Sequence, residues 1–225
     1  MPTVAERIPP LVAGDRLTRE EFLRRWEAMP RVKKAELIGG VVYIPSPVRL
    51  DHGESHSDIA AWLGVYAAST TGCRGGKNAT WYMLKDAPQP DGHLRILPEY
   101  GGQSDIEDGY GQGAPELAAE ISLSSTAYDL HQKMELYRKA DVLEYVTVLV
   151  WEQEVRWHRL VNGVYEQMPL PTDGILRSGV FPGLWLNVPA LLGGDMAQVL
   201  TTVQQGIQSP EHAAFVEELA RKRAR

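Results

Sequence analysis

The sequence predicts one α/β domain with a mixed β-sheet, and three observations lead to this prediction. Short apolar runs that suit strands are interspersed with longer segments of helical periodicity. Hydrophobic residues make up 44% of the 225 residues and charged residues 23%, as in typical globular domains. No repeat or low-complexity tract interrupts the chain. We expect an N-terminal arm at 1–17, the domain itself at 18–205 and a helical extension at 206–225.

The first third of the chain predicts a helix, a hairpin and a second helix. Thr18 and Glu21 form a capping box, and apolar residues follow at helical spacing, so a short helix is expected over 18–28. Two apolar runs within 35–44 are separated by a Gly-Gly pair, which is typical of a β-hairpin. Residues 52–68 place apolar side chains at i, i+3, i+4 and i+7, so we expect an amphipathic helix there.

The rest of the chain alternates between strand and helix signals. In order, the expected elements are a Gly-rich turn at 71–76, a strand at 79–84, an apolar run at 94–97, a loop at 98–114, a strand at 116–123, a helix at 124–140 that Ser125 or Thr126 caps, strands at 144–150, 154–160 and 163–168, and helical structure over 189–224. The loop at 98–114 is longer than most structural connections, which indicates a functional or mobile segment.

Charge and cysteine content exclude several classes of protein. With 23 Lys and Arg against 29 Asp and Glu, the net charge is −6, which argues against a nucleic-acid coat protein that binds by charge alone. Cys73 is the only cysteine, so neither a disulfide framework within the chain nor a multi-cysteine zinc site is possible. No apolar run is long enough to span a membrane, and no secretory leader is visible. We therefore expect a soluble cytoplasmic protein without a membrane partner.

The strand expected at 116–123 carries the first candidate for chemistry. Side chains of a strand alternate between two faces, so Leu117, Ala119 and Ile121 share one face while Glu120 and Ser122 share the other. A carboxylate late in a short apolar strand is costly to bury unless a cation or a hydrogen-bond donor meets it. Glu120 is therefore a candidate site residue.

A second acid and a lysine complete the pattern. Asp91 follows a proline and precedes another apolar run, which places a second carboxylate at a strand entrance. On a helical projection of 124–140, Lys133 borders the apolar stripe, whereas Lys139 faces solvent. An acid after proline, a strand with Glu-x-Ser and a helix with an inward lysine resemble the arrangement in PD-(D/E)XK nucleases. Two such carboxylates can hold Mg²⁺, and a lysine can orient or deprotonate the attacking water.

Longer segments make the resemblance more specific. Segments 35–47, 89–104, 116–145 and 181–192 are similar to the restriction endonuclease family called the Uma domain of unknown function, of the PD-(D/E)XK superfamily. The resemblance covers most of residues 18–215. It implies a restriction-endonuclease-like mixed sheet flanked by helices, with additional strands and a helical C-terminus, in a nuclease-like domain at 18–205.

The resemblance also implies roles for individual residues. Asp91 and Glu120 would bind Mg²⁺ or Mn²⁺, and Lys133 would be a catalytic lysine displaced from its usual position. Glu36 matches an acid that opens the first strand of the family and would be an auxiliary catalytic residue. His52 matches a histidine that begins its second helix and is a candidate for substrate contact. Ser122 stands where the simplest superfamily pattern has the lysine, and it is a candidate for substrate contact. The implied substrate is DNA, and a homodimer would match the two strand cuts of a duplex.

Other interpretations remain open at this point. The chain could be a noncatalytic module that binds nucleic acid or protein and retains the nuclease fold. His52 and His56 share a helix face and suggest a zinc hydrolase, although Glu54 is one residue late for the HExxH pattern. A further set of alternatives concerns single residues: a simple turn for Asp91, an edge-strand surface acid for Glu120, a surface lysine with a buried stem for Lys133, and a surface ion pair of Glu36 with Lys33 or Lys34.

Overall fold

The structure is a computed structural model that describes residues 8–44, 50–122 and 128–224, without the side chains of 50–53 and 128–130. Its main feature is a six-stranded sheet with the strand order β11-β10-β9-β8-β5-β3. The strands are β3 (Cys73–Gly76), β5 (Gly92–Ile96), β8 (Leu117–Ser122), β9 (Glu144–Leu149), β10 (Glu154–Val161) and β11 (Val164–Gln167). Strands β8 and β9 are parallel and the other neighbours are antiparallel, so the mixed sheet is confirmed.

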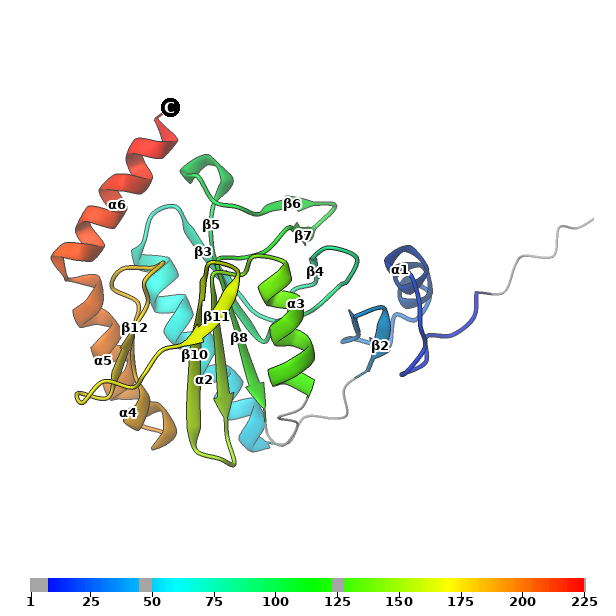
Figure 1. Ribbon diagram of the computed structural model, residues 1–225, viewed down its shortest axis with the longest axis horizontal. Helices are drawn as coiled ribbons and strands as arrows, with labels where there is room; N and C mark the ends of the chain where they lie inside the picture. The colour runs from blue at the N-terminus through cyan, green and yellow to red at the C-terminus, as the bar shows by residue number, and fades with distance from the viewer. Residues whose placement is uncertain (1–7, 45–49, 123–127, 225) are drawn as a thin grey trace, which may run out of the picture.

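Helices cover both faces of this sheet (Figure 1). One face packs against α2 (Leu50–Ser69) and the C-terminal helices α4 (Val188–Leu192), α5 (Met196–Ile207) and α6 (Pro210–Arg223). The other face packs against η2 (Tyr128–Lys133), a π-helix, and the helix α3 (Met134–Lys139) that continues it. The crossover between the parallel strands β8 and β9 contains η2 and α3, as parallel pairing requires.

Strand β8 follows the alternation expected from its sequence, but both of its faces are buried. Leu117, Ala119 and Ile121 enter the large core under α2, whereas Ala118 enters the smaller core under α3. Glu120 therefore faces η2 and α3. An interior strand has neighbours on both sides, and helices cover both of its faces, so the polar face of β8 never reaches the molecular surface.

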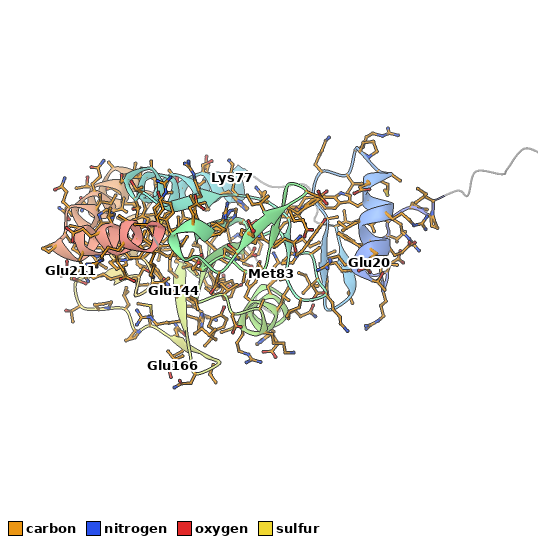
Figure 2. All side chains as sticks on the ribbon, turned by 90° about the horizontal axis from the view of Figure 1, so that it is seen from above. Glu20, Lys77, Met83, Glu144, Glu166 and Glu211 are labelled. Carbon is orange, nitrogen blue, oxygen red and sulfur yellow. The ribbon has the colours of Figure 1, made fainter. Side chains whose placement is uncertain are left out.

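An N-terminal hairpin module lies beside the sheet. It consists of α1 (Arg19–Glu27), β1 (Glu36–Ile38) and β2 (Val41–Tyr43), and its own apolar cluster includes Phe22 and Leu37. The Gly39-Gly40 turn has φ of 59° and 73°, as a two-residue hairpin turn requires. Glu20 in this module and Glu211 in α6 lie at opposite ends of the molecule (Figure 2).

Two segments of the main body differ from the sequence prediction. The Gly-rich turn expected at 71–76 contains β3, an edge strand that has no apolar run and pairs with β5. The loop expected at 98–114 contains a 3₁₀ helix, η1 (Pro98–Tyr100), and the hairpin of β6 (Asp105–Glu107) and β7 (Tyr110–Gln112). Asp108 and Gly109 have φ of 51° and 84°, so an Asp-Gly turn closes this hairpin.

Smaller differences concern the remaining elements. The strand expected at 79–84 is only β4 (Trp81–Tyr82), which joins β6 and β7 in a separate sheet. Strands β12 (Ile175–Arg177) and β13 (Trp185–Asn187) pair with each other and had no sequence prediction. The expected cap at Ser125 or Thr126 lies outside the described residues.

The C-terminal helices are part of the main core. Residue 206 lies within α5, and Phe215 and Leu219 of α6 are buried in the cluster under α2. Arg223 donates a hydrogen bond to the Tyr100 hydroxyl at 2.9 Å, which fixes the end of α6 to η1. Among the described residues, no helix has both the length and the apolar character needed to cross a membrane.

Candidate active site

Four elements bring the predicted acids and the predicted lysine together. Glu36 begins β1, Asp91 immediately precedes β5, Glu120 lies in β8 and Lys133 ends η2. Because Gly92 pairs with Ala119 in antiparallel register, Asp91 and Glu120 occupy adjacent positions on neighbouring strands. Residues that lie far apart in the sequence therefore meet at one end of β8.

Lys133 connects two of the three carboxylates. Its Nζ lies 3.0 Å from Glu36 Oε1 and 2.9 Å from Glu120 Oε2. The side chains of these three residues are at most 5% exposed. An ammonium group between two carboxylates in a dry environment offsets much of the cost of burying all three charges.

The π-helix explains how Lys133 comes to point inward. Regular α-helical geometry places this lysine at the border of the buried stripe. The wider turn of η2 rotates each residue by less than an α-helix does, and the Lys133 side chain is 3% exposed at its end. Lys139 is 57% exposed and pairs with Glu135, in line with its expected place on the solvent side.

Tyr137 holds the other oxygen of Glu120. Its hydroxyl donates a hydrogen bond of 2.6 Å to Glu120 Oε1. Burial, together with the nearby carboxylates of Glu120 and Glu36, raises the pKa of Tyr137 well above its usual value. The hydroxyl therefore stays protonated and acts as a donor that orients the carboxylate.

Asp91 is held by a second group of donors. Its carboxylate accepts hydrogen bonds from Lys34 Nζ at 2.8 Å and from the Ile121 amide at 3.0 Å, and His56 Nε2 lies 3.7 Å away. Burial alone would raise the pKa of Asp91, but the charges of Lys34, Lys133 and His56 outweigh it and lower the pKa to about 2. Asp91 is therefore ionised throughout the neutral range.

Lys34 is the more accessible of the two lysines. Its side chain is 27% exposed, and besides Asp91 it donates to Asn78 Oδ1 at 3.2 Å. Burial opposes the charge of Lys34, but the carboxylates of Asp91 and Glu36 more than offset this, so its pKa is raised. The Lys34 amine thus stays an ammonium.

The hydroxyl groups of Ser122 and Thr147 lie beside Glu120. Thr147 pairs with Glu120 across the β8–β9 ladder, and Ser122 follows two positions later on the same face. Both side chains are buried, and within the described part of the chain neither hydroxyl has a hydrogen-bond partner. Buried polar atoms of this kind are normally satisfied by ordered water or a ligand.

This donor set fits a hydrated Mg²⁺ ion. The described residues contain no cluster of three or more His, Cys, Asp or Glu side chains arranged to hold a metal. Mg²⁺ does not need such a cage, because it keeps several waters and is commonly bound by one or two carboxylates. Asp91 and Glu120 could supply those carboxylates, and the buried hydroxyls of Ser122 and Thr147 could bond water.

The structure leaves one sequence prediction untested and contradicts another. His52 lies in α2, but its side chain is outside the described residues, so its predicted contact and the His52–His56 zinc alternative stay untested. The proposed surface ion pair of Glu36 with Lys33 or Lys34 is wrong, because Glu36 is buried and its ion pair is with Lys133.

Sequence reasoning missed Lys34 and Tyr137. Both left a weak signal in their spacing. Tyr137 follows Lys133 by four residues and so shares its helix face, and Lys34 precedes Glu36 by two residues. Such spacings occur throughout the chain, so they point to Tyr137 and Lys34 only once Lys133 and Glu36 are known to belong to the site.

Replacing Tyr137 by phenylalanine tests the ionised state of Glu120. The ring packing remains while the hydrogen bond to Glu120 is lost, and hydrogen bonds to charged groups contribute about 1.5–3 kcal/mol. We expect urea unfolding to show a loss of that size. Tyr165→Phe is the matched control, because it removes a hydrogen bond of 2.7 Å to the uncharged Val142 carbonyl. Equal losses in the two variants would contradict an ionised Glu120 as acceptor.

Comparison with known proteins agrees with this fold. A solved chain of similar structure is described as "Crystal structure of a putative nuclease belonging to DUF820 from Anabaena variabilis ATCC 29413". The match has a TM-score of 0.59 at 16% identity and covers 76% of this chain and 97% of that chain. The fold is thus the restriction-endonuclease-like α/β class predicted from the sequence. No curated protein sequence matches this one.

The family follows from the sequence match. Residues 19–189, more than half of the chain, match the family described as "Uma2: Putative restriction endonuclease". The chain therefore belongs to the Uma2 family, which confirms the resemblance drawn from its segments.

Proposed function

We propose that this protein is a metal-dependent endonuclease that hydrolyses phosphodiester bonds of DNA. The observation that carries the proposal is the connected network of Glu36, Lys133 and Glu120, next to Asp91 on the neighbouring strand. Membership of a restriction endonuclease family supports the reaction class. Burying these acids and a lysine also costs free energy that an apolar core would avoid, which is typical of a functional site.

Asp91 and Glu120 would hold Mg²⁺ or Mn²⁺, which supplies positive charge against the phosphate oxygens when it is bound. Tyr137 and the Ile121 amide keep the two carboxylates oriented. Lys133 positions the attacking water, and Glu36 fixes the Lys133 amine from the other side. Hydrolysis joins the water oxygen to phosphorus, breaks one phosphorus–oxygen ester bond and leaves a protonated hydroxyl on the departing strand.

The remaining predicted residues have supporting roles in this proposal. The Ser122 hydroxyl lies on the same strand face as Glu120 and would hydrogen-bond a site water or a substrate oxygen. His52 would contact substrate from the start of α2. We also propose a homodimer, because a duplex needs two cuts and a two-fold axis matches its symmetry.

A plasmid-nicking assay tests the proposed activity. Purified protein should nick supercoiled DNA with Mg²⁺ or Mn²⁺ and stop when EDTA is added. Asp91→Asn should be inactive because it loses the charge that binds the metal. Asp105→Asn should remain fully active, since Asp105 is an exposed acid on β6. DNA binding without cleavage in every metal would contradict the proposal and favour a noncatalytic binding module.

A further inference from the structure

The two lysines of the candidate site differ in their access to a substrate. Lys133 is enclosed by Glu36 and Glu120, and its side chain is 3% exposed. The Lys34 side chain is 27% exposed and contacts the third carboxylate, Asp91. A phosphodiester is too large and too strongly hydrated to reach a sealed amine. Of these two cations, Lys34 is therefore the one that an incoming phosphate can meet.

The contacts of Lys34 place its amine beside the other site residues. Ala35 and Glu36, which follow it, are both buried, while Lys33 on its other side is exposed. Lys34 lies in the irregular segment just before β1, and its contact with Asp91 places its amine at the same site as Glu36 and Lys133. The lysine thus reaches the site from the hairpin module, independently of η2 and β8.

Asn78 holds the Lys34 amine from the opposite direction. Its side-chain oxygen accepts the 3.2 Å hydrogen bond from Lys34, and its backbone N–H donates to the Pro90 carbonyl at 3.0 Å. The second bond ties the Asn78 segment to the residue before Asp91. Asn78 and Asp91 therefore both accept hydrogen bonds from the Lys34 amine.

An ammonium group has three N–H donors. Within the described residues, Asp91 and Asn78 accept two of those of Lys34, which leaves the third donor for another acceptor. The charges around the Lys34 amine favour the binding of an anion only partly. Glu36, Asp91 and Glu120 carry three negative charges against two positive charges on Lys34 and Lys133, so phosphate binding also requires the metal that the proposed function includes.

We infer that Lys34 is a second catalytic residue, whose remaining N–H donates to a nonbridging oxygen of the scissile phosphate. This inference rests on the proposed function and assigns the two lysines different roles in it. Lys133 serves the attacking water in the interior, and Lys34 stabilises the negative charge that develops on the phosphate. Asn78 is a positioning residue that acts through Lys34.

The test compares Lys34→Met and Lys34→Arg with Lys33→Met, which removes a neighbouring exposed lysine. Single-turnover cleavage of a duplex is measured with Mg²⁺ and excess full-length protein, beside thermal unfolding and DNA affinity. Loss of one preorganised donor typically reduces the rate by about 100-fold, which we expect for Lys34→Met with a much smaller change in affinity. Lys34→Arg should recover part of the rate, and Lys33→Met should match the wild-type protein.

Three outcomes would overturn the inference, and they are distinguishable. Cleavage by Lys34→Met at the rate of Lys33→Met, while Glu120→Gln is inactive, rejects the role of Lys34 and leaves the proposed function intact. A rate loss in Lys34→Met that follows loss of folding, without recovery in Lys34→Arg, assigns Lys34 a structural role only. Absence of cleavage by the wild-type protein in every metal rejects the proposed function and this inference together.

Discussion

Replacing Glu120 by glutamine is expected to abolish DNA cleavage, with a loss of about 1,000-fold or more. Glutamine keeps the size of the side chain but carries no charge, so it cannot help to neutralise a divalent cation. It also replaces one acceptor oxygen by a donor NH₂ group that would face either Lys133 Nζ or the Tyr137 hydroxyl. The plasmid-nicking rate with Mg²⁺ measures the effect.

The control for this variant is Glu166→Gln. Glu166 is exposed on β11 (Figure 2), so its substitution removes the same charge from the chain without touching the site. Both variants should unfold cooperatively, because Lys133 keeps its contact with Glu36 when Glu120 is neutral. A folded Glu120→Gln protein that cleaves as fast as Glu166→Gln would remove Glu120 from the proposed reaction.

Replacing Lys133 by methionine is expected to cost about 3–5 kcal/mol of the free energy of unfolding. The substitution keeps most of the side-chain volume but leaves the carboxylates of Glu36 and Glu120 buried together without the cation between them. Urea unfolding measures the loss. Part of it should return in the double variant Glu36→Gln/Lys133→Met, which removes one of the two uncompensated charges.

Lys139→Met is the matched control. Lys139 lies on the same helix, but it is 57% exposed and pairs with the half-exposed Glu135, so its removal should cost well under 1 kcal/mol. A similar cost for the two lysines would contradict the interpretation of Lys133 as a buried counterion. The absence of any recovery in the double variant would contradict the pairing with Glu36.

Local patterns in the sequence predicted the part of the site that lies on regular elements. Alternation in β8 placed Glu120 opposite the apolar residues, and the structure has that arrangement. Helical periodicity selected Lys133 over Lys139. Both predictions succeed because periods of 2 and about 3.6 residues fix side-chain direction within one element.

The partners of these residues could not be predicted in the same way. Lys34 and Asp91 are separated by 57 positions, and nothing local to either residue specifies that contact. The buried state of Glu36 depends on the docking of β1 beside the segment that precedes β5, through the Leu37–Ala87 bridge. Tertiary packing therefore determines which cation each acid meets.

Two elements were missed for a different reason. Strand β3 is mostly small and polar, so its strand character comes from pairing with β5 and not from its own residues. The hairpin of β6 and β7 has exposed or half-exposed positions throughout and lacks the apolar alternation that reveals a strand. Only its Asp-Gly turn was a usable signal.

The candidate site is complete only when the N-terminal hairpin module is docked on the main body. Most of the apolar residues of this module pack in one cluster that also includes Ala87, while Ile38 of β1 packs in the cluster under α3. The segment just before β1 and β1 itself contribute Lys34 and Glu36. A local opening that detaches the module would withdraw one cation and one anion at once, while the β8–β9 ladder remained paired. Amide protons of β1 and β2 should then exchange with solvent as one group, faster than those of β8. The fraction of molecules with an assembled site would then depend on this local opening, which costs less free energy than complete unfolding.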